Sequence, residues 1–261
     1  MLEVRELTKR FGGFTAVDRI DFDLAEGEIL GLIGPNGSGK STTFNLVAGA
    51  LAPSGGSIRL DGREIGGLSS TEVCHRGIAR TYQIPRPFRK LTILENVALA
   101  AYFGANSLIS RSEAWRRAEE ALALTRLPVD PTIRVDGLGA AGLKKLELAR
   151  ALATQPRLLL ADESLGGLDE QEMDQAADML SDIRRERGIT IIWVEHIMGV
   201  LMRVVDRCVV LDHGVVIASG LPHDVAHDPK VVEIYLGTDA ESVQSQVAGR
   251  RSDTAAGAAA C

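Results

Sequence analysis

The feature that most limits the possible folds is the stretch ILGLIGPNGSGKSTTFNLV over residues 29–47. Its first six residues are apolar or Gly, which is typical of a strand buried on both faces of a sheet. The segment GPNGSGKS over 34–41 matches the pattern G-x-x-x-x-G-K-[ST], and the residues that follow have the period of a helix. A buried strand, a Gly-rich turn and a helix together predict a phosphate-binding loop in an α/β protein.

The spacing of this motif follows from what a phosphate chain requires. Gly residues let the backbone turn so that successive N–H groups point at phosphate oxygens, and a helix beginning near Gly39 adds the positive end of its dipole. Lys40 is expected to bring its charge to the β and γ phosphates, and the Ser41 hydroxyl to bind Mg²⁺. An ordinary Gly-rich turn is the alternative. The predicted nucleotide-binding residues are Gly34, Pro35, Asn36, Gly37, Ser38, Gly39, Lys40, Ser41 and Thr42.

A second buried strand, RLLLADE at 157–163, ends in two adjacent acids. Ligands of α/β folds bind at the carboxyl edge of the sheet, so both acids are predicted to lie there. Asp162 is expected to hold Mg²⁺ through water, and Glu163 to orient and polarise an attacking water. A solvated acidic strand end would be the favoured interpretation if the Gly-rich motif were absent.

The remaining periodicity predicts an α/β protein with helices on both faces of its sheet. Residues 88–127 are expected to be mostly helical, and 143–154 form another predicted helix. Asp61–Gly62 has the composition of a hairpin turn within 55–65. Further strands are predicted at 2–7, 20–24, 189–196 and, around His213–Gly214, at 207–220. The tail 239–261 has almost no large apolar residues and is expected to be disordered.

Composition narrows the class of function. A net charge of −6 argues against general nucleic-acid binding, which needs clustered Lys and Arg. Cys74, Cys208 and Cys261 lack the spacing of a zinc site, and their odd number does not suggest disulfides, so a reducing compartment fits. The N-terminus MLEVRELTKRFGG has no apolar stretch of signal-peptide length, and no run of about 18 apolar residues occurs. Any membrane role is expected to depend on a partner.

With these two motifs, the chain resembles the ATP-binding subunits of ABC transporters over about residues 2–237. The resemblance implies a RecA-like P-loop ATPase core at 1–82 and 157–238, with an N-terminal antiparallel β subdomain. It also implies an inserted helical subdomain at 83–156, which makes 1–238 one nucleotide-binding domain. The implied activity is ATP hydrolysis coupled to transport, with ATP and Mg²⁺ as cofactors.

The resemblance also implies further site residues. Phe11, 29 residues before Lys40, lies where the family stacks an aromatic ring on adenine. Gln83, in RTYQIPRPF, matches the glutamine that contacts Mg²⁺ and water and senses the membrane subunit. Asp169 ends GGLD, which matches the loop where two ATPase subunits meet, and His196 matches the histidine that contacts the γ-phosphate. Taken singly, Phe11 could be a core residue, Gln83 a surface amide and His196 structural.

Three longer segments resemble the branched-chain amino-acid uptake branch, in the first of its two ATPase subunits. They are FGGFTAVDRIDF, GIARTYQIPRPFRKLTILENV and DPKVVEIYLG at 228–237. Another small amino acid, an amide or urea stays open as the solute. The implied partners are a second ATP-binding subunit (a sister chain or a second copy), two membrane-spanning permease subunits and a periplasmic or extracellular solute-binding protein. The implied location is peripheral, on the cytoplasmic face of the inner membrane, and Pro85, Arg86, Pro87 and Phe88 are expected to line the docking groove.

One motif departs from the family pattern. LGAAG at 138–142 stands where the family has Leu-Ser-Gly-Gly-Gln, a helix start that contacts ATP bound by the opposite subunit. Gly139, Ala140 and Ala141 keep the backbone N–H groups and the helix dipole but lack the serine hydroxyl. We expect an asymmetric pair, in which this chain's own ATP is hydrolysed and the partner's ATP turns over slowly. The alternative is that the amides and dipole suffice at both sites.

Two other classes compete with a transporter subunit. A DNA-maintenance or translation ATPase of the same superfamily would be expected to carry a coiled coil, zinc modules or a second ATPase domain. A small-molecule kinase would lack the matched Gln83, GGLD and His196. Ser164, where the family usually has Pro, lies beside Glu163 and leaves that acid in place.

Overall fold

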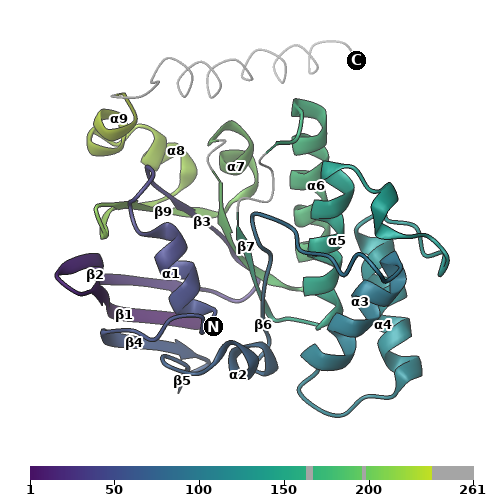
Figure 1. The fold of residues 1–261 in the computed structure, drawn as a ribbon. Coiled ribbons are helices and arrows are strands. Elements are labelled where there is room, and N and C mark those ends of the chain that lie inside the picture. The colour runs from purple at the N-terminus through teal and green to yellow at the C-terminus, as the bar shows by residue number, and fades with distance from the viewer. Residues whose placement is uncertain (163–166, 196–197, 237–261) are drawn as a thin grey trace, which may run out of the picture.

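The computed structural model describes residues 1–162, 167–195 and 198–236. A six-stranded sheet has the order β10-β9-β3-β8-β7-β6, in which β10 is antiparallel to β9 and the other pairs are parallel (Figure 1). Within these ranges, no helix has both the length and the apolar character needed to cross a membrane. The strands are β3 (Ile29–Ile33), β6 (Ile78–Arg80), β7 (Leu158–Asp162), β8 (Thr190–Val194), β9 (Arg207–Asp212) and β10 (Val215–Gly220).

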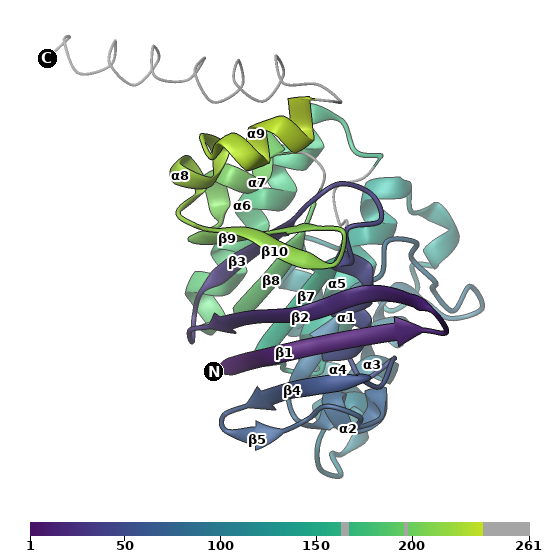
Figure 2. The same ribbon diagram turned by 90° about the vertical axis from the view of Figure 1, so that its left-hand side faces the viewer.

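The second sheet is antiparallel and comes from the N-terminal part of the chain (Figure 2). Its order is β2-β1-β4-β5, and it confirms the expected antiparallel β subdomain. The hairpin turn at Asp61 and Gly62 is also confirmed, since both residues have positive φ, as a two-residue hairpin turn requires. The strands are β1 (Leu2–Phe11), β2 (Phe14–Leu24), β4 (Gly55–Leu60) and β5 (Arg63–Glu64).

Alternate residues of the central strands enter two different cores. Leu30 and Leu32 of β3 pack with Phe44 of helix α1 (Lys40–Val47) and with the apolar face of the antiparallel sheet. Ile29 and Ile33 of the same strand belong to the core on the opposite face, with apolar residues of the helices there. Helices therefore contact both faces, as predicted, but α1 shares its face with the second sheet.

Both predicted helical regions, 88–127 and 143–154, contain helices, and the second begins earlier than predicted, at Ala140. Residues 88–127 are mostly helical, as predicted, and they form two helices that begin directly after the capping residues Thr92 and Ser110. Thr92 forms a capping box with Glu95, and 105–110 connects the two helices. The helices after α1 are α2 (Ser70–His75), α3 (Ile93–Gly104), α4 (Arg111–Leu124), α5 (Ala140–Ala153), α6 (Glu170–Arg187), α7 (Met198–Val204), α8 (Pro222–Ala226) and α9 (Pro229–Leu236).

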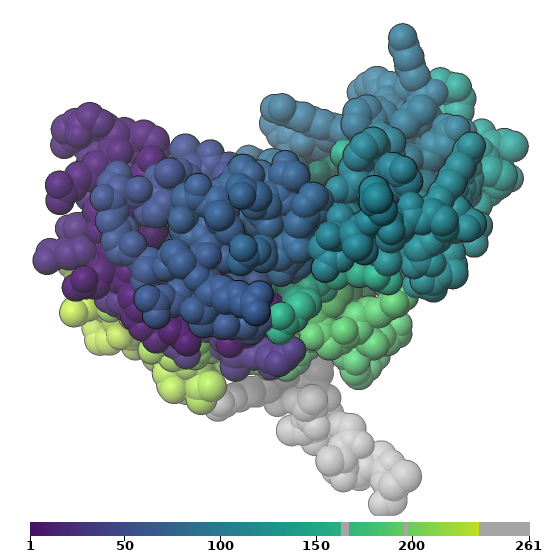
Figure 3. All heavy atoms as spheres, turned by 90° about the horizontal axis from the view of Figure 1, so that it is seen from below, coloured from purple at the N-terminus to yellow at the C-terminus, as the bar shows by residue number. Residues whose placement is uncertain are grey.

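Helices α3, α4 and α5 pack on one another through small buried side chains, which include Ala101, Ala118 and Ala149. They lie together on the side of the molecule away from the antiparallel sheet. From below, the purple and blue N-terminal part and the teal helical part form two adjoining lobes (Figure 3). The residue limits of the helical subdomain stay a prediction.

Candidate nucleotide-binding and hydrolysis site

Residues 34–39 connect β3 to α1 at the carboxyl edge of the parallel strands, and Lys40 and Ser41 begin the helix. Gly34 and Gly39 have φ of 150° and 103°, a region that residues with a side chain rarely adopt. A Cβ on Gly34 would lie 2.1 Å from the Leu211 carbonyl oxygen, and one on Gly39 would lie 2.8 Å from the Ala16 oxygen. These two positions require Gly because neighbouring backbone leaves no room for a side chain.

Backbone hydrogen bonds hold this loop against the turn between β9 and β10. The Gly214 N–H donates to the Ser38 oxygen at 3.1 Å, and the Asp18 N–H donates to the Gly214 oxygen at 2.8 Å. The Ser38 hydroxyl is buried and has no hydrogen-bond partner within the described ranges. An unsatisfied buried hydroxyl is costly, and an incoming phosphate oxygen would satisfy it.

Lys40 folds back over the loop. Its Nζ donates to the carbonyl oxygens of Gly34 at 2.7 Å and Pro35 at 2.9 Å, and the side chain is buried. Gly39 is the N-cap of α1 and offers no side-chain cap, while Ser41 is exposed on the first helical turn. A helix start without a side-chain cap, next to a lysine, is well suited to bind an anion.

Asp162 ends β7 and is buried at the same edge of the sheet. Its N–H donates to the Thr81 hydroxyl at 3.1 Å, and its Oδ2 accepts from Nη2 of Arg80 at 2.6 Å. Arg80 also donates from Nη1 to Oδ1 of Asn45 on α1, at 2.6 Å. A chain of charged and amide groups therefore joins the phosphate-loop helix to the end of β7.

Sequence reasoning missed both Arg80 and Asn45. Arg80 stands in the quoted segment RTYQIPRPF, three residues before Gln83, and a charged residue at the end of a buried strand was the available signal. Asn45 had no such signal, because an amide within a helix is ordinary and its partner is 35 residues away.

The oxygen donors fit a magnesium ion. Mg²⁺ prefers carboxylate, hydroxyl and amide oxygens and usually keeps several waters. The hydrogen bond from Arg80 engages Oδ2 of Asp162, Ser41 is exposed on α1, and Gln83 is exposed just after β6. Ser41 lies on α1, Asp162 ends β7 and Gln83 follows β6, the strand next to β7, and their role in metal binding stays a prediction.

Of three further predicted site residues, the structure describes only Phe11. Glu163 and His196 lie outside the described residues. Phe11 ends β1 with 47% of its surface exposed, so it is not a core residue, and Lys9 Nζ lies 5.1 Å from its ring centroid. An exposed ring is free to stack on a flat ligand, but its contact with adenine stays a prediction.

The altered motif begins helix α5, as predicted. Gly139 is its N-cap, with φ −70° and ψ −176° and no side-chain cap, and Ala140 and Ala141 are its first two residues. Asp169 is the N-cap of α6 and forms a capping box with Glu172. Helix α5 packs with α3 and α4 and lies on the opposite side of the sheet from α1 (Figure 1).

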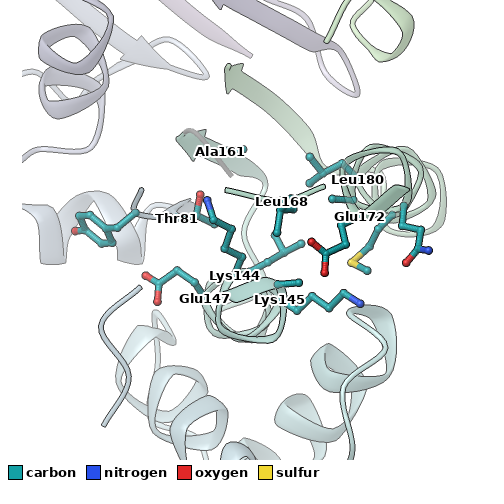
Figure 4. Close-up of a pocket in the computed structure, with 14 residues that line it drawn as sticks. Thr81, Lys144, Lys145, Glu147, Ala161, Leu168, Glu172 and Leu180 are labelled. Carbon is teal, nitrogen blue, oxygen red and sulfur yellow. The ribbon is translucent and has the colours of Figure 1, made fainter. Parts of the chain in front are cut away.

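A separate cavity of about 110 Å³ lies between α5 and α6 (Figure 4). Its walls are mainly apolar, with Leu148 and Leu180 among them, and Lys145 is one of its charged residues. None of the residues 34–41 lines it. The cavity is therefore distinct from the phosphate loop, although Ala141 of the altered motif reaches its edge.

Helix α5 is also tied to the chain that follows Gln83. Glu147 is buried, and burial raises the pKa of its carboxyl, while the Arg150 guanidinium at 2.9 Å acts in the opposite direction. Arg150 donates onward to the Arg86 carbonyl oxygen at 3.1 Å and lies 5.4 Å from the Phe88 ring centroid. Arg150 therefore links the 86–88 segment to this helix.

Comparisons with known proteins agree with the resemblance. The ABC transporter family matches residues 17–166, and the family described as branched-chain amino acid ATP-binding cassette transporter matches 215–241. The high-affinity branched-chain amino acid transport ATP-binding protein BraF of Pseudomonas aeruginosa is 36% identical over 253 residues, 91% of this chain and 98% of its own length. LivG of Escherichia coli, described in the same words, is 34% identical over 249 residues and is likewise covered over 98% of its length.

Solved structures give the same answer. The ADP conformation of an ATP-binding cassette of an ABC transporter superposes with a TM-score of 0.82, at 29% identity, over 91% of this chain and 98% of that one. A dimeric bacterial ABC transporter cassette superposes with a TM-score of 0.76, at 28% identity, over 85% and 99%. With its phosphate loop, sheet-edge aspartate and sequence similarity along nearly its whole length, this chain belongs to the ABC transporter family, as one of its ATP-hydrolysing subunits.

Proposed function

We propose that this subunit powers the import of branched-chain amino acids by hydrolysing ATP at the 34–41 loop and Asp162. The observation that carries the site is the sheet edge on which the loop, Asp162 and Arg80 converge. The solute rests on the names of BraF and LivG and on the 215–241 match. Another small amino acid, an amide or urea is the alternative solute.

In this proposal, Lys40 exchanges partners when nucleotide binds. Its Nζ leaves the carbonyl oxygens of Gly34 and Pro35 for the β and γ phosphate oxygens, because charge-assisted hydrogen bonds are stronger than neutral ones. The Ser38 hydroxyl, which has no hydrogen-bond partner among the described residues, gains one. Ser41, Asp162 and Gln83 hold Mg²⁺, which when bound neutralises charge on the β and γ phosphates.

Glu163 is the proposed general base and His196 the proposed contact to the γ-phosphate. Glu163 immediately follows Asp162, so it is attached to the end of β7 at the same sheet edge. A carboxylate there can accept a proton from a water that attacks in line. Phe11 is proposed to stack on adenine, since an exposed aromatic ring gains from covering a flat apolar base.

A second ATP-binding subunit completes each site. We place Gly139, Ala140 and Ala141 against ATP bound by that partner, with Asp169 at the contact between subunits. The dimeric cassette among the structural neighbours supports a pair of ATP-binding subunits. A hydrogen bond to a charged group contributes about 1.5–3 kcal/mol, so loss of the serine hydroxyl slows hydrolysis at the partner's site.

The pair is proposed to dock on two membrane-spanning subunits at the cytoplasmic face of the membrane, with a solute-binding protein on the outer side. Phe88 is 48% exposed, and its ring packs on the Arg150 guanidinium. The ring gives the 85–88 segment an apolar point of attachment for a partner. Because Arg150 also pairs with Glu147, docking at this segment acts on α5, the helix that Gly139 precedes as N-cap.

Two variants test the ATP site. Glu163→Gln should bind a fluorescent ATP analogue as the wild type does but nearly stop phosphate release, and Lys40→Ala should lose ATP binding. Wild-type hydrolysis by Glu163→Gln would exclude the general-base role. Uptake of labelled leucine and of labelled urea by the reconstituted complex distinguishes the solutes, and ATP-driven urea uptake without leucine uptake would contradict the main proposal.

The asymmetry has its own test in the assembled complex. The usual motif is rebuilt by Gly139→Ser, Ala140→Gly, Ala141→Gly and Gly142→Gln together. Faster ATP hydrolysis and transport are expected, because the partner's γ-phosphate regains its hydroxyl donor. Unchanged rates, in a complex that forms normally, would contradict asymmetry.

A further inference from the structure

Arg80 ends β6 with its guanidinium enclosed beside the proposed metal ligand. The side chain is 11% exposed, and it donates to Oδ2 of Asp162 and to Oδ1 of Asn45, both at 2.6 Å. The guanidinium carbon also lies 5.8 Å from the ring centroid of Phe44 and 5.1 Å from that of Tyr82. Two hydrogen bonds and two aromatic rings hold this group in one place.

The position has an electrostatic cause. Asp162 is only 6% exposed at the end of an apolar strand, where a carboxylate without a counter-charge is strongly disfavoured. Arg80 supplies that charge before nucleotide arrives. Its hydrogen bond engages Oδ2 of the acid and not Oδ1.

The position also has a mechanical consequence. Asn45 lies on α1, one turn beyond Ser41, so the guanidinium connects the helix of the phosphate loop to the end of β7. The Thr81 hydroxyl, on the next residue, accepts the Asp162 N–H, which reinforces the connection. The same strand leads, three residues later, to Gln83. One side chain thus links all three elements that carry the proposed metal ligands.

We propose that Arg80 is a positioning residue for nucleotide-bound Mg²⁺. It holds Asp162 by one oxygen and fixes the distance between that acid and α1, so that the ion meets a preformed set of ligands. This inference rests on the metal site of the proposed function. The opposite role, a cation that competes with Mg²⁺ for Asp162, predicts the opposite effect of removing it.

The test measures how much Mg²⁺ strengthens ADP binding. The dissociation constant of a fluorescently labelled ADP is determined for the full chain with excess Mg²⁺ and with EDTA. The ratio of the constant in EDTA to the constant in Mg²⁺ measures how much the metal strengthens binding. Outer-shell partners of metal ligands typically change metal affinity by 10–100-fold. Arg80→Met and Arg80→Lys should therefore each lower the ratio about tenfold, while the constant in EDTA stays within about twofold of the wild type.

A matched control is Arg207→Met. Arg207 donates to Glu28 at 2.9 Å in a half-buried pair at the opposite, amino edge of the sheet, so the same kind of ion pair is lost away from the metal. Its ratio should equal that of the wild type. If the Arg80 variants do not fold, Asn45→Ala removes the anchor on α1 while keeping the Asp162 pair, and a smaller fall in the ratio is expected.

The outcomes separate the two proposals. A ratio in folded Arg80 variants that equals or exceeds the wild-type ratio overturns the positioning role, and an increase identifies Arg80 as a competitor of Mg²⁺. An equal fall in Arg207→Met would assign the effect to general destabilisation and would overturn it too. A wild-type ratio of one, by contrast, overturns the metal site itself.

Discussion

Gly139→Ser should make the subunit more stable, because it adds a missing cap to α5. Gly139 is the N-cap with φ −70°, a value that any residue adopts, and a Cβ built on it meets no atom within 4 Å. The new hydroxyl can accept the N–H of Ala141 or Gly142, as an N-cap Ser does. Neither steric clash nor backbone strain opposes the change.

Two contributions set the magnitude. Replacing Gly by a residue with a side chain stabilises a compatible site by about 0.4–1 kcal/mol, because the unfolded chain loses freedom. Ser exceeds Gly as an N-cap by a few tenths of a kcal/mol. The sum, about 0.5–1.5 kcal/mol, corresponds to a rise in Tm of roughly 1–6 °C for a domain of this size.

Thermal unfolding followed by circular dichroism measures this difference, with Gly139→Ala as the matched control. Ala removes the same freedom from the unfolded chain but cannot cap, and a Ser cap is worth about 1 kcal/mol more than Ala. The Ser variant should therefore unfold at a higher temperature than the Ala variant. Equal Tm values, or a Ser variant below the wild type, would refute the assignment of Gly139 as an uncapped helix start.

Two further predictions concern other positions. Gly34→Ala should lower Tm strongly and abolish nucleotide binding, because its Cβ would lie 2.1 Å from a carbonyl oxygen. The control Gly13→Ala has open space around its Cβ and should change Tm by less than about 2 °C. Similar losses of Tm in the two variants would contradict the steric reasoning. Burial raises the pKa of Glu147 above its ordinary value of 4.5, so its contribution to stability is full below that pH and is lost as the pH rises through the folded-state pKa. The Tm of the neutral variant Glu147→Gln, minus that of the wild type, should accordingly be higher at about pH 7.5 than at about pH 5. A Tm difference that does not change with pH would exclude this titration.

The sequence by itself determined the parts of the site that depend on neighbours along the chain. A Gly-rich turn between a buried strand and a helix places Lys40 and Ser41 at a helix start, and the run RLLLAD places Asp162 at a strand end, wherever these elements pack. The turns at 61–62 and 213–214 could likewise be predicted, because each is a two-residue turn with positive φ that ends in Gly. The helix boundaries within 88–127 were harder to predict, because apolar residues continue on both sides of the N-caps Thr92 and Ser110.

Only the tertiary structure decided which distant groups meet. Arg80 contacts Asn45 across 35 residues and Asp162 across 82, and nothing in the local pattern of any of the three indicates the others. Gly34 cannot carry a side chain because the carbonyl oxygen of Leu211, from a distant part of the sequence, occupies that space. Strand order produces both contacts: β6, β7 and β9 come from separate parts of the sequence and share a sheet edge with α1, so their side chains meet through packing and not through spacing.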